Sequence, residues 1–79
     1  MVYTKFALIA TTPHEESKVY NDLLNRKQIT EIHSIFGEYD LIAKCEGENE
    51  DNLTTFINGI KNLKGVEKIK ALSGPTPSS

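Results

Sequence analysis

The sequence predicts a single α+β domain of the ferredoxin-like type, in which the elements follow the order βαββαβ. Four short segments rich in β-branched or aromatic residues alternate with two stretches of helical spacing, and a glycine-containing turn joins the two central segments. The length of 79 residues leaves room for one modest core. We therefore expect one domain over residues 1–73, with residues 74–79 as a flexible tail.

The first half of the chain predicts a strand followed by a helix. Residues 3–11 form the predicted strand, which leads directly into a helix start. Thr12 is the expected N-cap, Pro13 the first helical residue and Glu15 the third, which makes a capping box. The helix is expected to end at about Arg26.

The second half predicts a hairpin, a helix and a last strand. Strands over residues 29–36 and 41–46 flank the turn "GEYD", and the last strand covers residues 66–72. Asn49 is the expected N-cap of the second helix, and Gly65 is expected to stop it. The apolar residues of this helix share one face: Leu53, Phe56, Ile57, Ile60 and Leu63.

Both faces of the predicted four-stranded antiparallel sheet are apolar. The two helices cover only one of them. In the first strand Phe6, Leu8 and Ala10 alternate with Ala7 and Ile9, so neither set is polar. A second apolar face on so small a domain predicts a homodimer that forms sheet to sheet.

Composition excludes several classes of function. The net charge of −2, with acids and bases interspersed, argues against a protein that mainly neutralises phosphates. The single cysteine, Cys45, cannot form an intrachain disulfide. No apolar run reaches the length of a signal-peptide core or a membrane span, which predicts a cytoplasmic protein.

Candidate catalytic groups are few. The chain holds two histidines, His14 and His33, and neither belongs to a spacing typical of metal ligands, so we expect no metal and no cofactor. The strand over residues 41–46 lacks the aromatic residues on which RNA-recognition modules stack bases. A hydrolytic, redox or nucleic-acid-binding site is unsupported.

The stretch "GEYD" allows two interpretations. It is a turn in any case, because glycine supplies a positive φ and the acids can cap local amides. Its tyrosine, carboxylates and backbone amides could also hold the ammonium and carboxylate of a small zwitterion near a subunit boundary. The residues alone leave both interpretations open.

The whole pattern resembles the effector-binding and oligomerisation (RAM) domain of the Lrp/AsnC transcription regulators. The resemblance is carried by "KFALIATTP", by "ITEIHSIFGEYDLIAKCEGEN" and by "LTTFINGIKNLKGVEKI". It implies dimers that assemble further, most often into an octamer, and an effector such as an amino acid at the contacts between dimers. It also implies a set of ligand-binding positions: Ser34, Gly37, Glu38, Tyr39, Asp40 and Ala71.

Two features depart from that family pattern. A Thr-x-Thr sequence is frequent on the family's last strand, but the corresponding positions here are Ile69 and Ala71, so the site would be less polar or would serve assembly alone. The chain also begins directly in the first predicted strand, without a helix-turn-helix. This predicts a stand-alone module that acts on transcription indirectly, for instance by mixing with full-length Lrp/AsnC regulators.

Two alternatives of other classes stay open. One is a small cofactor-free enzyme on a dimeric ferredoxin-like barrel, for which His33 is the available catalytic group. The other is an ACT-type regulatory domain, which binds amino acids near its first loop. That loop usually carries a Pro-Gly pair, and "TTPHEE" lacks the glycine.

Overall fold

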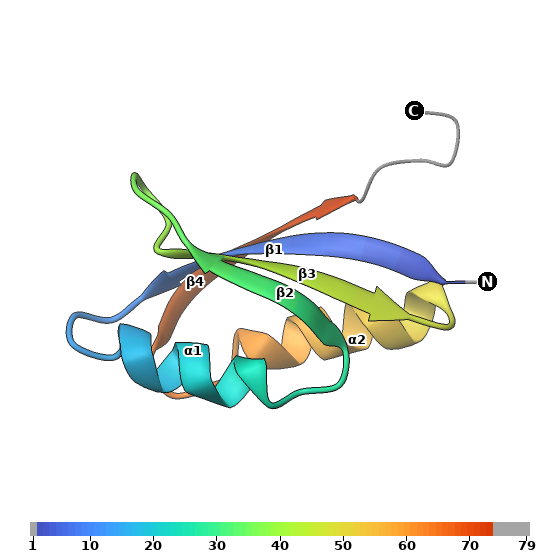
Figure 1. Ribbon diagram of the computed structural model, residues 1–79, viewed down its shortest axis with the longest axis horizontal. Coiled ribbons are helices and arrows are strands. Elements are labelled where there is room, and N and C mark those ends of the chain that lie inside the picture. The colour runs from blue at the N-terminus through green and yellow to red at the C-terminus, as the bar shows by residue number, and fades with distance from the viewer. Residues whose placement is uncertain (1, 74–79) are drawn as a thin grey trace.

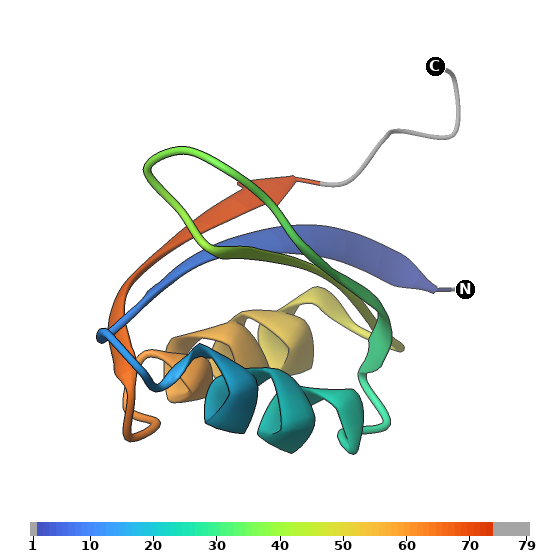
Figure 2. The same ribbon diagram turned by 60° about the vertical axis from the view of Figure 1, so that its left-hand side comes forward.

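A computed structural model describes residues 2–73 and confirms the predicted ferredoxin-like fold. The four antiparallel strands lie in the order β2-β3-β1-β4, and both helices cover one face of the sheet (Figures 1 and 2). In chain order the elements are β1 (Tyr3–Thr11), α1 (Glu16–Leu24), β2 (Ile29–Ser34), β3 (Leu41–Gly47), α2 (Glu50–Ile60) and β4 (Val66–Ser73). The predicted tail, residues 74–79, lies outside the described residues.

The core lies between the two central strands and the helices. Ala7 pairs with Ala43 and Ile9 pairs with Leu41, so these side chains share the face that the helices cover. All four are fully buried. The predicted stripe of α2 packs against them: Leu53, Ile57 and Ile60 are buried, and Phe56 and Leu63 are partly buried.

The predicted cap of α2 is confirmed. The Asn49 side chain accepts a hydrogen bond from the backbone N–H of Asn52 at 2.7 Å. Glu50 and Asp51 lie in the first turn, where the helix dipole favours negative charge. The predicted end of α2 is wrong, because the helix ends at Ile60 and not next to Gly65, so Leu63 lies beyond it. The chain then turns to Gly65, whose φ of 97° starts the approach to β4.

The predicted start of α1 is wrong. The helix begins at Glu16, its cap residue Glu15 makes no side-chain capping hydrogen bond, and His14 has a left-handed φ of 71°. Thr12 is not the cap because the left-handed His14 interrupts the helical backbone after Pro13. Residues 12–15 instead form a turn, in which the Glu15 N–H donates to the Thr12 carbonyl at 3.0 Å and the Thr12 N–H donates to the carbonyl of Gly65 at 2.8 Å.

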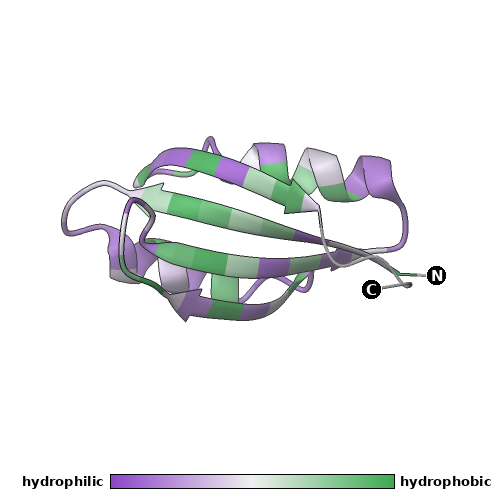
Figure 3. Cartoon of the chain, turned by 90° about the horizontal axis from the view of Figure 1, so that it is seen from above, coloured by the Kyte–Doolittle hydropathy of each residue, from purple (hydrophilic) through white to green (hydrophobic). Residues whose placement is uncertain are grey.

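The face of the sheet opposite the helices, called the free face below, is apolar in its middle and charged at its edges. Phe6 and Leu8 of β1 lie there beside Ile42 of β3, and Leu72 of β4 is 39% exposed. The apolar colouring in Figure 3 concentrates along the central strands. Lys68 and Lys70 lie on the β4 edge, and Glu31 and His33 lie on the β2 edge.

None of the helices in residues 2–73 is long and apolar enough to cross a lipid bilayer.

Candidate functional site

The segment between β2 and β3 is a protruding loop rather than a tight turn. Strand β2 ends at Ser34, two residues earlier than predicted, and the loop closes through the backbone N–H of Ile35, which donates to the carbonyl of Asp40 at 2.9 Å. Gly37 has a φ of 116°, a conformation that favours glycine, as the turn interpretation requires. Residues 35–40, called the hairpin loop below, rise on the free-face side of the sheet (Figure 1).

Asp40 ties the hairpin loop to β1. One carboxylate oxygen of Asp40 accepts from the Thr11 backbone N–H at 2.7 Å and from the Thr11 hydroxyl at 3.1 Å. The Asp40 backbone N–H donates to the carbonyl of Ile9 at 2.9 Å. The pairing of β1 with β4 shifts register between Ala10 and Thr11, so Asp40 supports the irregular stretch of β1.

Glu38 and Tyr39 tie the same loop to β4. The Lys68 ammonium donates to the Glu38 carboxylate at 3.1 Å and lies 5.2 Å from the centre of the Tyr39 ring. The hydrogen bond from Lys68 to Glu38 is the main reason why the pKa of Lys68 is raised. Ala10, the register partner of Lys68 on the free face, is buried.

Phe36 is the most unusual residue of the hairpin loop. Its side chain is fully exposed, whereas each of the other two phenylalanines is partly buried. Exposed aromatic side chains are typical of contact surfaces between proteins. In the sequence Phe36 ends the predicted strand over residues 29–36, and no motif marks it as a contact residue.

Ser34 and Ala71 lie apart from the hairpin loop. Both pair with residues of the helix-covered side, Ser34 with Leu41 and Ala71 with Ala7, on strands at opposite edges of the sheet. The Ser34 hydroxyl donates to Glu16 of α1 at 3.3 Å. Ile69 packs against the core. A single chain therefore brings Gly37, Glu38, Tyr39 and Asp40 together but not all six predicted positions.

The groups considered for catalysis do not converge. His33 is exposed on the free face and lies 3.3 Å from Glu31, and Cys45 is fully buried in the core. Burial raises the pKa of the Cys45 thiol to about 11, which disfavours a nucleophilic thiolate. Residues 2–73 contain no cluster of three or more acidic, histidine or cysteine side chains placed to hold a metal ion.

Comparison with known families identifies the fold's relatives. The family model described as "Lrp/AsnC ligand binding domain" matches residues 4–72. The chain belongs to the Lrp/AsnC ligand-binding domain family. This confirms the resemblance drawn from the sequence and separates the chain from the ACT-type alternative.

Curated Lrp/AsnC relatives are transcription regulators. The HTH-type transcriptional regulator FL11 of Pyrococcus furiosus is 29% identical over 62 residues, which cover 78% of this chain and 41% of the relative. The FL11 protein of Pyrococcus abyssi matches equally well. The chain thus spans about two fifths of the length of these curated relatives. These names favour a regulatory role over an enzymatic one.

Two solved structures match almost the whole chain. The crystal structure of FFRP-DM1 is 30% identical, with a TM-score of 0.88, over 95% of this chain and 100% of that one. The protein PHS023 from Pyrococcus horikoshii is also 30% identical, with a TM-score of 0.85, over 96% of this chain and 92% of that one. The architecture, including the order of elements, is therefore that of the family.

Proposed function

We propose that the chain is an effector-binding and oligomerisation module that acts in transcription regulation and binds a small molecule, such as an amino acid, where copies of the chain meet. The observation that carries this proposal is the free face. Its apolar middle is not covered by any part of residues 2–73, and the hairpin loop rises beside it. Membership of the Lrp/AsnC ligand-binding family supports the small-molecule part.

The charges at the edges of the free face favour one arrangement of two copies. In a face-to-face pair with a two-fold axis parallel to the strands, the β4 edge of one copy lies over the β2 edge of the other. Lys70 then lies level with His33, two residues along β2 from Glu31, which is the nearest acidic side chain on that edge. An axis across the strands would instead place lysines over lysines, which costs electrostatic energy. We therefore propose a homodimer with the first arrangement.

The same arrangement supports a ligand site shared between copies. Ser34 lies at the level of Ile9, and Ala71 lies at the level of Ala7, so the two are close along the strands but at opposite edges. Their side chains lie on the helix-covered side, so they could approach each other only at the rim of the paired sheets, where the β2 edge of one copy closes against the β4 edge of the other. The hairpin loop, with Tyr39, would border them, and further assembly of dimers into an octamer would enclose this region.

A thermal-shift screen against the twenty amino acids tests the ligand part. For a ligand present at about 100 times its dissociation constant, binding stabilises the folded state by about 2.7 kcal/mol, which shifts the melting temperature measurably. The variant Tyr39→Leu is expected to lose the shift. The variant Tyr3→Leu, at the start of β1 and far from the hairpin loop, is expected to keep it.

A screen in which no amino acid changes the melting temperature would contradict the ligand part of the proposal. If no amino acid at millimolar concentration changed the melting temperature, an amino-acid effector would be excluded. A shift that survived in Tyr39→Leu would place the effector away from the hairpin loop.

A further inference from the structure

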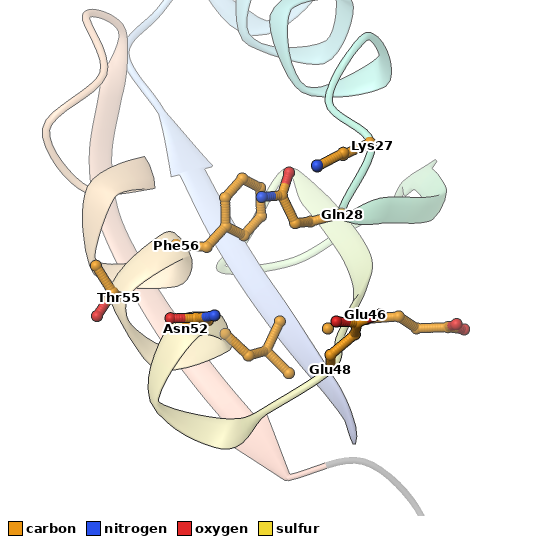
Figure 4. Close-up of a pocket in the computed structure, with 9 residues that line it drawn as sticks. Lys27, Gln28, Glu46, Glu48, Asn52, Thr55 and Phe56 are labelled. Atoms are coloured by element: carbon orange, nitrogen blue, oxygen red, sulfur yellow. The ribbon is translucent and has the colours of Figure 1, made fainter. Parts of the chain in front are cut away.

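A groove of about 660 Å³ lies on the helix side of the molecule, at the end of the sheet away from the hairpin loop. The chain segment that enters β2, the end of β3 and the neighbouring side of α2 form its walls (Figure 4). This volume falls within the range of roughly 300–1,000 Å³ that is typical of small-molecule sites. The residues that matter for its chemistry are Lys27, Gln28, Glu48, Asn52, Leu53 and Phe56.

The groove has an apolar wall. Leu53 is buried and Phe56 is partly buried, and both belong to α2. Gly47 at the end of β3 lies against Leu53, since a Cβ at that position would lie 3.6 Å from the Leu53 Cβ. The carboxamide of Gln28 lies beside the Phe56 ring, and the Lys27 ammonium lies at the same end (Figure 4). A polar end therefore adjoins an aromatic surface.

Three polar side chains of this groove have no partner in the part of the chain that the structure describes. Within residues 2–73, the side chains of Lys27, Gln28 and Asn52 make no hydrogen bond or ion pair. The Gln28 backbone, in contrast, is fixed, because its carbonyl accepts from the Glu46 N–H at 2.8 Å. The donors are thus available, and the Gln28 backbone that carries one of them is anchored.

The charges of the groove are separated along its length. The Glu46 carboxylate is engaged elsewhere, 3.7 Å from the Lys44 ammonium and 3.3 Å from the Thr30 hydroxyl. The remaining charges are Lys27 at the end with the Phe56 ring and Glu48 at the other end (Figure 4). An anionic group therefore meets a cation and carboxamide donors only at the Lys27 end.

We propose that this groove binds a small carboxylate with a flat apolar body. The carboxylate accepts from the Lys27 ammonium and the Gln28 carboxamide, and the apolar body packs on Phe56 and Leu53. The site is independent of the proposed effector site at the hairpin loop. Because it lies on the helix side, dimerisation through the free face leaves it open.

Phenylacetate and phenethylamine provide a matched pair of probes, because they share the ring but carry opposite charges. Phenylacetate is expected to bind with a dissociation constant of about 1 mM and to shift the side-chain amide signals of Gln28 and Asn52 in a nitrogen-15 NMR titration. Lys27→Gln is expected to weaken binding about tenfold, since a charge-assisted hydrogen bond is lost. Lys61→Gln, a change of an exposed lysine outside the groove, is expected to leave the affinity unchanged.

Several results would overturn the groove proposal. These are no shift of the Gln28 and Asn52 signals at about 10 mM phenylacetate, equal binding of phenethylamine, or equal loss of affinity in Lys27→Gln and Lys61→Gln. Tyr39→Leu is expected to bind phenylacetate as well as the wild type. Loss of phenylacetate binding and loss of the amino-acid response are therefore separate outcomes.

Discussion

Gly65 and Gly59 show at the scale of one residue how backbone geometry decides the effect of an added methyl group. Gly65 has a φ of 97°, and a Cβ there would lie 2.9 Å from the Glu15 Cβ and 3.1 Å from a methyl group of Val19. Gly59 lies inside α2 with ordinary φ and open space around it. The same substitution to alanine should therefore have opposite effects at the two positions.

We expect Gly65→Ala to lower the free energy of unfolding by about 1–3 kcal/mol, because the positive φ and the close contacts both become unfavourable. Gly59→Ala should raise it by about 0.5–1 kcal/mol, because alanine is the better helix former. Urea denaturation at one fixed protein concentration measures both. Equal effects of the two changes would contradict the positions assigned to α1 and the entrance of β4.

Cys45 predicts a loss of stability at high pH. Its pKa is raised to about 11 by burial, from an ordinary value of 9.0, so the unfolded chain loses the proton first. Stability from this group is therefore complete below about pH 9 and falls as the pH rises toward 11, by on the order of 2 kcal/mol. Denaturation curves at pH 8 and 10.5 test this, with Cys45→Ser as the control.

The burial of Cys45 also predicts slow alkylation of its thiol. Iodoacetamide at pH 8 should modify Cys45 only in the unfolded chain, because the thiolate is disfavoured and inaccessible in the fold. Equal rates with and without urea would contradict the position of Cys45 in the core.

At the scale of elements, the hairpin loop is held by two kinds of contact of different strength. Asp40 is partly buried and accepts two hydrogen bonds from Thr11, whereas the pair of Glu38 and Lys68 is exposed. We expect Asp40→Ala to cost about 1–3 kcal/mol of unfolding free energy, since the Thr11 donors lose their partner. Glu38→Ala should cost less than about 1 kcal/mol.

Urea denaturation of the two variants in parallel gives the comparison. If Glu38→Ala lowered the free energy of unfolding more than Asp40→Ala, the contact with β4 would stabilise the hairpin loop more than the contact with β1 does.

The comparison of the two helices shows which elements the sequence could predict. The start of α2 was predicted correctly because its cap, Asn49 to Asn52, is local. The start of α1 was misplaced because His14 takes a left-handed φ, in a turn whose Thr12 N–H is bound by Gly65, more than fifty residues away in the sequence. The core face of α2 was also predicted correctly. Its apolar periodicity, like the cap, depends only on neighbours along the chain.

The candidate sites were predictable to a smaller extent. The hairpin residues Gly37 to Asp40 could be selected from a motif, but the engagement of Asp40 by Thr11 depends on a contact across 29 residues. The groove near Lys27 and Phe56 combines segments that are also far apart in sequence, and no motif marks it. Side chains that meet only through tertiary structure leave no local signal.

At the scale of the whole molecule, the charges at the edges of the free face predict how exchanging a lysine and a glutamate changes self-association. Lys70→Glu should weaken self-association several-fold, because it replaces the cation nearest Glu31 of a second copy by a like charge. Adding Glu31→Lys to the same chain should restore association. Analytical ultracentrifugation of the two single variants and the double variant measures this, and a double variant weaker than both singles would contradict the proposed two-fold axis.

The central claim is that a second copy covers the free face, and the mass in solution tests it most directly. Light scattering should give at least twice the 8.8 kDa of the chain for the wild type. Leu8→Lys, in the middle of the free face, should give 8.8 kDa while circular dichroism shows an intact fold. Asn58→Lys, on the exposed side of α2, should behave as the wild type. A wild-type mass of 8.8 kDa at roughly 100 μM would contradict the claim.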